Sequence, residues 1–219
     1  MKEKFIQLLE EIKKDLIFIA NEVEHNIRQA IKALEKRDIK LAEQVIAHDE
    51  NIDRMEVQIE ENFLSLLALQ QPVAIDLRFI VGGLKMNNDL ERIGDHAVNI
   101  ARTVLDIKER PLPDSIKKIP TMKNLACSML HDIVSAFIHQ DAEQAREVCA
   151  KDNSVDRLYD EIVKDTIEQV KNDQSLLEQG FAIARVARSL ERVGDLATNI
   201  GEDVVFMKDA KIIRHRFEK

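Results

Sequence analysis

The chain has few of the residues that form tight turns, and it has no tryptophan. Among its 219 residues only 6 are glycine and 4 are proline. So few turn residues over this length predict few, long secondary-structure elements. Hydrophobic residues make up 45% and charged residues 33% of the chain. The hydrophobic content excludes a disordered chain, and the high charged content favours long helices with solvated faces over a sheet protein.

The sequence also lacks the basic character of a nucleic-acid-binding protein. The formal net charge is −8 and the pI is about 5.4. Recognition of DNA or RNA needs a positively charged surface, so a nucleic-acid partner is not expected. An acidic balance suits cationic partners, either metal ions or basic protein surfaces, but it is equally compatible with plain solubility.

Cysteines are few and long apolar runs are absent. Cys127 and Cys149 follow no metal-binding spacing and lie on the apolar side of helical patterns, which predicts reduced core thiols. Met1-Lys2-Glu3-Lys4 leads into an amphipathic stretch, so no signal peptide is expected. No apolar run approaches the roughly 20 residues that span a bilayer. We therefore expect a cytoplasmic protein that reaches the inner face of the membrane only through partners.

Helical periodicity runs along nearly the whole chain. From Phe5 to Leu34 apolar residues recur at steps of three and four, which is the period of a helix. Asp38 and Asp141 each precede a new apolar pattern and are predicted N-caps. Arg110-Pro111-Leu112-Pro113 is the one proline-rich stretch and is the predicted linker. The predicted helices span about 5–34, 38–70, 74–108, 119–139, 141–172 and 175–207.

The two halves of the sequence are related by duplication. Residues 90–102 and 190–202 are identical at eight of thirteen positions at a constant offset of 100. Matching of that density indicates an internal repeat. We therefore predict an all-α fold of two three-helix bundles related by a pseudo-two-fold axis, with repeats at residues 1–110 and 111–219.

Acidic residues recur at helical spacing on the predicted middle and third helices of each repeat. Two carboxylates four positions apart are neighbours on a helix surface and repel each other. If the helices present these faces to each other, four carboxylates converge in each bundle, and a hard cation would turn the repulsion into attraction. The candidate metal ligands are Asp49, Asp53, Glu91, Asp95 and Asn99 in the first half, and Asp152, Asp156, Glu191, Asp195 and Asn199 in the second.

A plainer interpretation is that these faces are solvated and neutralised by nearby arginines, namely Arg54, Arg92, Arg157 and Arg192. His96 lies next to the first stripe, but the equivalent residue is Leu196, so histidine is not a shared ligand. That disfavours zinc, whereas iron, manganese, magnesium or calcium suit carboxylates. Gly94 and Gly194 lie in mid-helix, either for close approach by a neighbouring backbone or an ion cluster, or for tight helix packing.

No catalytic arrangement is recognisable in the sequence. A glycine-rich phosphate loop, a nucleophile elbow and an interpretable pairing of histidine with serine or cysteine are all missing. We therefore expect a regulator or scaffold rather than an enzyme. Two other hypotheses remain, a carboxylate-bridged metal-storage or oxidase-type bundle and a purely structural helical protein. The absence of Glu-x-x-His motifs argues against the first of them.

The residues resemble the PhoU family of phosphate-uptake regulators over nearly the whole chain. The resemblance rests on residues 71–78 (QPVAIDLR), residues 88–101 (NDLERIGDHAVNIA) and residues 198–205 (TNIGEDVV). Two departures are Leu196, where a histidine is often found, and Gly201, where alanine is common; neither removes a carboxylate.

This resemblance implies two three-helix bundles with metal clusters on Glu/Asp-x-x-x-Asp motifs, here the eight carboxylates named above. It also implies a regulator of phosphate homeostasis that damps two partners when phosphate is plentiful. Those partners are the ATPase of the high-affinity phosphate ABC transporter and the phosphate sensor histidine kinase. A homodimer is the expected assembly.

Overall fold

The computed structural model describes residues 2–70, 72, 75–107 and 111–210. The described part of the chain contains long helices and no strand, as the sequence predicted. The elements are α1 (Lys2–Lys36), α2 (Ile39–Gln70), α3 (Ile75–Asp106), η1 (Asp114–Lys118), α4 (Ile119–His139), α5 (Ala142–Asn172), η2 (Gln174–Leu176) and α6 (Leu177–Asp209).

Equivalent turns join the first two helices of each half. The residues before the caps, Arg37 and Gln140, have left-handed backbone conformations with φ of 51° and 53°. Asp38 Oδ1 then accepts a hydrogen bond from the amide of Leu41 at 3.0 Å. Asp141 Oδ1 likewise accepts from two amides at the start of α5, both at 3.0 Å. Both predicted N-caps are therefore confirmed, and each satisfies amide groups that the first turn of a helix leaves unpaired.

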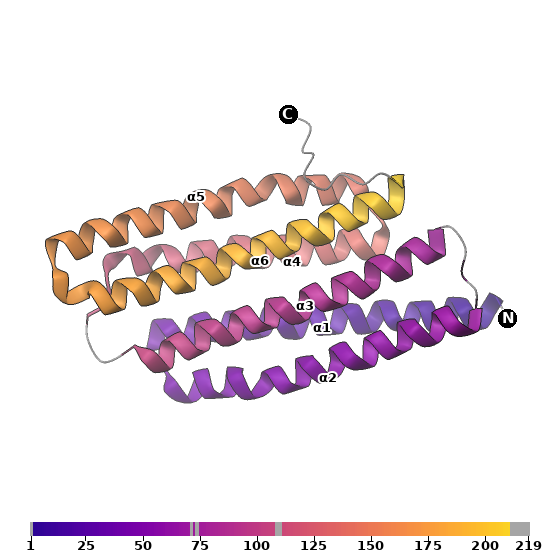
Figure 1. The fold of residues 1–219 in the computed structure, drawn as a ribbon, viewed down its shortest axis with the longest axis horizontal. Helices are drawn as coiled ribbons and strands as arrows, with labels where there is room; N and C mark the ends of the chain where they lie inside the picture. Colours follow the sequence, from indigo (N-terminus) through magenta and orange to yellow (C-terminus); the bar gives the residue numbers. More distant parts are fainter. Residues whose placement is uncertain (1, 71, 73–74, 108–110, 211–219) are drawn as a thin grey trace.

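Two bundles of three helices lie side by side (Figure 1). Helices α1–α3 form one and α4–α6 the other, while α3 runs antiparallel to α6, and α1 contacts α4. Arg78 Nε donates a hydrogen bond across this junction to the backbone oxygen of Met207 at 2.9 Å. The rings of Phe79 and Phe137 also meet across it, with centroids 5.2 Å apart. The junction thus includes the start of α3, the end of α6 and α4, besides the contact of α1 with α4.

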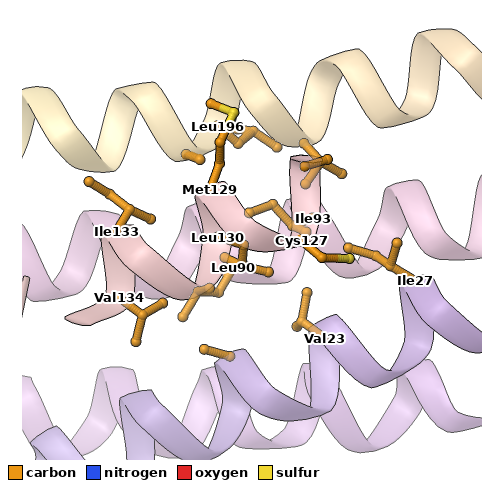
Figure 2. Close-up of a cluster of buried hydrophobic side chains, with 14 of the residues drawn as sticks. Val23, Ile27, Leu90, Ile93, Cys127, Met129, Leu130, Ile133, Val134 and Leu196 are labelled. Carbon is orange, nitrogen blue, oxygen red and sulfur yellow. The ribbon is translucent and has the colours of Figure 1, made fainter. Parts of the chain in front are cut away.

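The hydrophobic core continues from one bundle into the other (Figure 2). Val23 and Ile27 of α1 and Leu90 of α3 point toward Leu130 of α4. Cys127 lies among them with its thiol unpaired, and Cys149 is also buried and unpaired. Burial raises the pKa of both thiols to about 11. The prediction of reduced core cysteines is confirmed.

A short ordered turn follows the segment predicted as a linker. Residues 108–110, and with them the predicted boundary between repeats, lie outside the described residues. The 3₁₀ turn η1 follows and packs on α5, where the hydroxyls of Ser115 and Thr166 lie 2.7 Å apart. The backbone amide of Asp114 donates to the side chain of Gln169. Periodicity does not reveal this turn, because five residues are too few to establish a pattern. No helix in the described ranges is long and apolar enough to cross a membrane.

Candidate metal centres

The first acidic face lies between α2 and α3. Asp49 packs over Gly94 of α3, where its Oδ1 atom lies 3.2 Å from the place that a Cβ atom on the glycine would take. Burial raises the pKa of Asp49 to about 6, and the nearby charges of Asp53 and Asp95 add to the rise. The pKa of Glu91 is also raised, first by burial and then by Asp95, Asp53 and other carboxylates. The four carboxylates of the first half are therefore close enough to influence one another electrostatically.

The second half repeats the arrangement between α5 and α6. Asp152 Oδ1 lies 2.7 Å from the Cβ position of Gly194. The pKa of Asp152 rises to about 7, because of burial first and then the charges of Asp156, Asp195 and Glu191. Four carboxylates thus lie close enough to repel one another in this half too. In water such repulsion is weak, and partial burial strengthens it.

Gly94 and Gly194 have the same role in both halves. Each leaves room for an aspartate carboxylate of the middle helix to lie against the backbone of the third helix. Ile52 and Val155 approach the same positions at 3.4 and 3.5 Å, which is ordinary packing contact. At both glycines the nearest atom is therefore a carboxylate oxygen, closer than any atom of the neighbouring apolar side chains.

The arginines of the middle helices do not neutralise these faces. Arg54 Nε donates to the backbone oxygen of Glu50 at 3.0 Å, and its Nη2 donates to Asn51 Oδ1 at 2.9 Å. Arg157 Nε donates in the same way to the backbone oxygen of Asn153 at 3.0 Å. Both guanidinium groups thus bind their own helix rather than the aspartates that directly precede them, Asp53 and Asp156.

The arginines of the third helices behave differently from each other. Arg92 pairs with Asp89 at 3.3 Å, outside the predicted ligand set. Arg192 pairs with Asp195 at 2.6 Å, inside it. The plainer interpretation, in which arginines balance the acidic faces, therefore holds at one of the four predicted positions.

Two buried carboxylate oxygens of the second half have no hydrogen-bond partner, Asp152 Oδ1 and Glu191 Oε2. The other oxygen of Glu191 pairs with Arg188, while Oε2 lies 3.9 Å from Arg192 Nε. An unsatisfied buried carboxylate oxygen is costly unless a ligand completes its coordination. Among the described residues, no three His, Cys, Asp or Glu side chains are grouped closely enough to hold a metal ion in the conformation of this structure.

The donor set nevertheless fits a hard cation. Carboxylate oxygens crowd in each half, their pKa values are raised, and a glycine clears space beside them. Iron, manganese, magnesium and calcium all accept such oxygen ligands. The residues that would hold the ion are Asp49, Asp53, Glu91 and Asp95 in one half, and Asp152, Asp156, Glu191 and Asp195 in the other.

Each predicted asparagine ligand follows an aspartate of the acidic face by four residues, which is about one helical turn. Asn99 is exposed, and Asn199 lines a different cavity of about 530 Å³ on the seam between α3 and α6. Lys85 Nζ contacts Asp203 Oδ1 there at 2.8 Å. Asp89 lines the same cavity, and burial raises its pKa to about 6. Asp89 is not among the candidate residues predicted from the sequence, although it stands directly before the duplicated segment and within the segment that resembles the PhoU family.

The fold and these faces define a class of protein, a duplicated three-helix bundle with one carboxylate-rich face in each repeat. The model of the PhoU domain matches residues 16–104 and again residues 119–204. A phosphate-specific transport system accessory protein PhoU homolog of Clostridium acetobutylicum is 37% identical over 93% of this chain and 93% of its own length. One from Aquifex aeolicus is 37% identical over 99% of this chain and 98% of its own.

Solved structures agree with the sequence matches. The crystal structure of PhoU from Pseudomonas aeruginosa superposes with a TM-score of 0.89 at 32% identity, over 94% of this chain and all of that one. The phosphate transport system regulatory protein PhoU from Streptococcus pneumoniae gives a TM-score of 0.89 at 31% identity, over 95% of this chain and 98% of its own. The chain belongs to the PhoU family.

Proposed function

We propose that this protein is an accessory regulator of phosphate transport. The observation that carries the proposal is the family match in both halves, at residues 16–104 and 119–204, to relatives named phosphate-specific transport system accessory proteins. The partners are the ATPase of the phosphate ABC transporter and the phosphate sensor histidine kinase, and the protein damps both when phosphate is plentiful. It acts by binding rather than by catalysis, in the cytoplasm at the inner face of the membrane, where those partners hold it.

We also propose that each acidic face binds metal, with iron, manganese, magnesium or calcium favoured over zinc. The support is the convergence of four carboxylates in each half and the two unpartnered buried oxygens of Asp152 and Glu191. A bound cation would neutralise the face and hold the middle and third helices together. Because charge complementarity governs which surfaces associate and how fast, partner binding should then depend on metal.

Co-purification with each partner, in the presence and absence of a chelator, tests this function. We expect binding of the ATPase and the kinase with metal and much weaker binding after chelation. The Glu191→Gln/Asp195→Gln variant should behave like the chelated protein. A matched control is Glu10→Gln/Glu11→Gln, which removes the same charge from exposed positions of α1. Binding that chelation and the first variant both leave unchanged would make the acidic faces structural only.

A further inference from the structure

The two acidic faces differ in the cationic side chains that contact them. In the second half, Arg188 pairs with Glu191, and Arg192 pairs with Asp195 at 2.6 Å. Both guanidinium groups therefore contact carboxylates of the proposed metal site. Among the described residues, no lysine or arginine forms an ion pair with any of the four carboxylates of the first face. The duplicated sites are thus unequal before any metal binds.

Two neighbouring positions of the duplicated helices explain the difference. Asn88 and Asp89 of α3 correspond to Arg188 and Ser189 of α6, at the offset of 100. Asp89 takes the guanidinium group of Arg92 at 3.3 Å, three residues further along the helix. Ser189 has no charge to offer the equivalent arginine of α6, so that arginine pairs with the aspartate three residues after it. The asparagine of α3 cannot neutralise a carboxylate, whereas the arginine that replaces it in α6 does.

A third difference helps to position Arg188. Its Cζ atom lies 5.6 Å from the centre of the Tyr159 ring on α5, a distance at which the face of the ring attracts a cation. The equivalent residue of α2 is Glu56, whose charge instead helps to raise the pKa of Glu91. The second face has a further carboxylate nearby too, Asp160. Carboxylates alone therefore do not distinguish the two faces, and the arginines do.

The two arginines offset part of the negative charge of the second face. The pKa of Glu191 is raised first by burial and then by Asp195, and both Arg188 and Arg192 oppose that rise. Arg188 also opposes the rise in the pKa of Asp156. At the equivalent glutamate of the first face, every nearby charge that affects the pKa belongs to a carboxylate.

Two cationic groups act on the first face without pairing with it. Arg102 and His48 oppose the rise in the pKa of Asp49. His48 pairs with Glu22 of α1 at 2.8 Å, and Arg102 is exposed. In the described part of the chain neither forms an ion pair with a carboxylate of the face, so a metal ion entering there has no guanidinium group to displace.

The arginines occupy some oxygens of the second face and leave others free. Their pairs use Oε1 of Glu191 and Oδ2 of Asp195. Asp152 Oδ1 and Glu191 Oε2 remain buried without a hydrogen-bond partner. The side chain of Glu191 is only 11% exposed, so water and salt screen its pair less than a pair on an open surface. The second face can therefore still take a cation, but only in competition with the two arginines.

Resting on the proposed metal binding, we infer that Arg188 and Arg192 are internal counter-ions that make the second acidic face the weaker metal site. A cation that binds there must displace both guanidinium groups or lie beside their positive charges. A cation that binds the first face meets neither obstacle. The first face therefore fills before the second as the metal concentration rises, and each ion bound at the second face releases two guanidinium groups of α6.

Manganese binding to the metal-free full-length chain tests this inference, with free Mn²⁺ measured by electron paramagnetic resonance and binding followed by calorimetry. Glu191→Ala/Asp195→Ala leaves only the first face, and Glu91→Ala/Asp95→Ala leaves only the second. We expect the chain with the first face to bind manganese about tenfold or more tightly than the chain with the second.

Removing the two arginines should strengthen the second face. In the chain that has only the second face, Arg188→Gln/Arg192→Gln should raise the affinity for manganese about tenfold. The matched control is Arg157→Gln/Arg185→Gln, which removes the same charge from the same bundle. It should leave the affinity unchanged, because Arg157 binds its own helix and Arg185 contacts Asp106 at 3.5 Å.

The first face offers the converse experiment. Asp89→Ser gives α3 the residue of α6 and deprives Arg92 of its partner. Arg92 should then pair with Asp95, and the first face should bind manganese more weakly. Asp89→Ser/Arg92→Gln should bind like the wild type, because the displaced arginine is gone. This pair of variants separates the effect of the arginine from that of the lost carboxylate.

Circular dichroism in a chelator checks that each variant folds. Arg188→Asn, which introduces the residue of the first half, replaces the double arginine variant if that one does not fold. Equal affinities of the two faces, or an affinity of the second face that the loss of its arginines leaves unchanged, would overturn the inference and leave the proposed metal binding standing. A wild-type chain that binds no manganese, iron, magnesium or calcium would overturn the proposed metal binding itself.

Discussion

Asp152 Oδ1 lies 2.7 Å from the position that a Cβ atom on Gly194 would occupy, and this buried oxygen has no hydrogen-bond partner. The glycine therefore determines where the carboxylate can lie. Gly94 and Asp49 have the same relationship at 3.2 Å in the first half. The same device in both repeats is the clearest geometric link between the duplicated sequence motif and a ligand site.

Replacing Gly194 by alanine should displace the Asp152 carboxylate and weaken metal binding at the second acidic face. The overpacking costs about 1–3 kcal/mol, and the better helix propensity of alanine offsets about 1 kcal/mol of it. Metal titration and urea denaturation of the variant measure the two effects separately.

Gly201→Ala is the matched control, because a Cβ atom there meets Cys149 Sγ, also at 2.7 Å, rather than a carboxylate oxygen. Both variants should lose stability, and only Gly194→Ala should lose metal affinity. An equal loss of metal affinity in the two variants would mean that Gly194 acts through general helix packing.

The metal-free protein should become less stable as the pH rises from about 4 to about 7. The pKa of Asp152 is raised from 3.8 to about 7, and that of Asp49 from 3.8 to about 6. A raised pKa means that the folded state binds the proton more tightly than the unfolded state. The stability from these groups is therefore fully present below pH 3.8 and is lost as the pH rises through the folded pKa values.

Urea denaturation in a chelator at pH 5 and pH 8 measures this effect. The Asp49→Asn/Asp152→Asn variant should lose less stability than the wild type between the two pH values, since the amides do not ionise. Added metal should restore the wild type at pH 8, because a cation replaces the proton between the carboxylates. Equal pH dependence in variant and wild type would remove these two aspartates as the cause.

The sequence predicted the helices because their determinants are local. Asp38 and Asp141 cap α2 and α5 with their own side chains, and the apolar steps of each helix require no knowledge of its neighbours. The sequence also predicted that acidic residues of the middle helices face the third helices. The duplicated spacing restricts how Asp49 and Asp152 can lie against α3 and α6.

Contacts between distant parts of the chain were not predictable. The bond from Arg78 to Met207 and the pair of Lys85 with Asp203 each join residues more than 100 positions apart. Which carboxylate an arginine chooses is equally hidden, because Arg92 has Asp89 and Asp95 at nearly equal spacing and pairs with Asp89. Side-chain direction on the helix decides between them, and only the structure gives it.

The proposed function requires that the two acidic faces are independent metal sites. Elemental analysis after loading with ferrous iron or manganese tests this directly, with Glu91→Ala/Asp95→Ala, Glu191→Ala/Asp195→Ala and their combination compared with Glu10→Ala/Glu11→Ala. Each of the first two variants should keep only the metal of the other half, the combined variant should bind none, and the control should match the wild type. Metal content that stays unchanged in the combined variant would contradict the assignment of both faces.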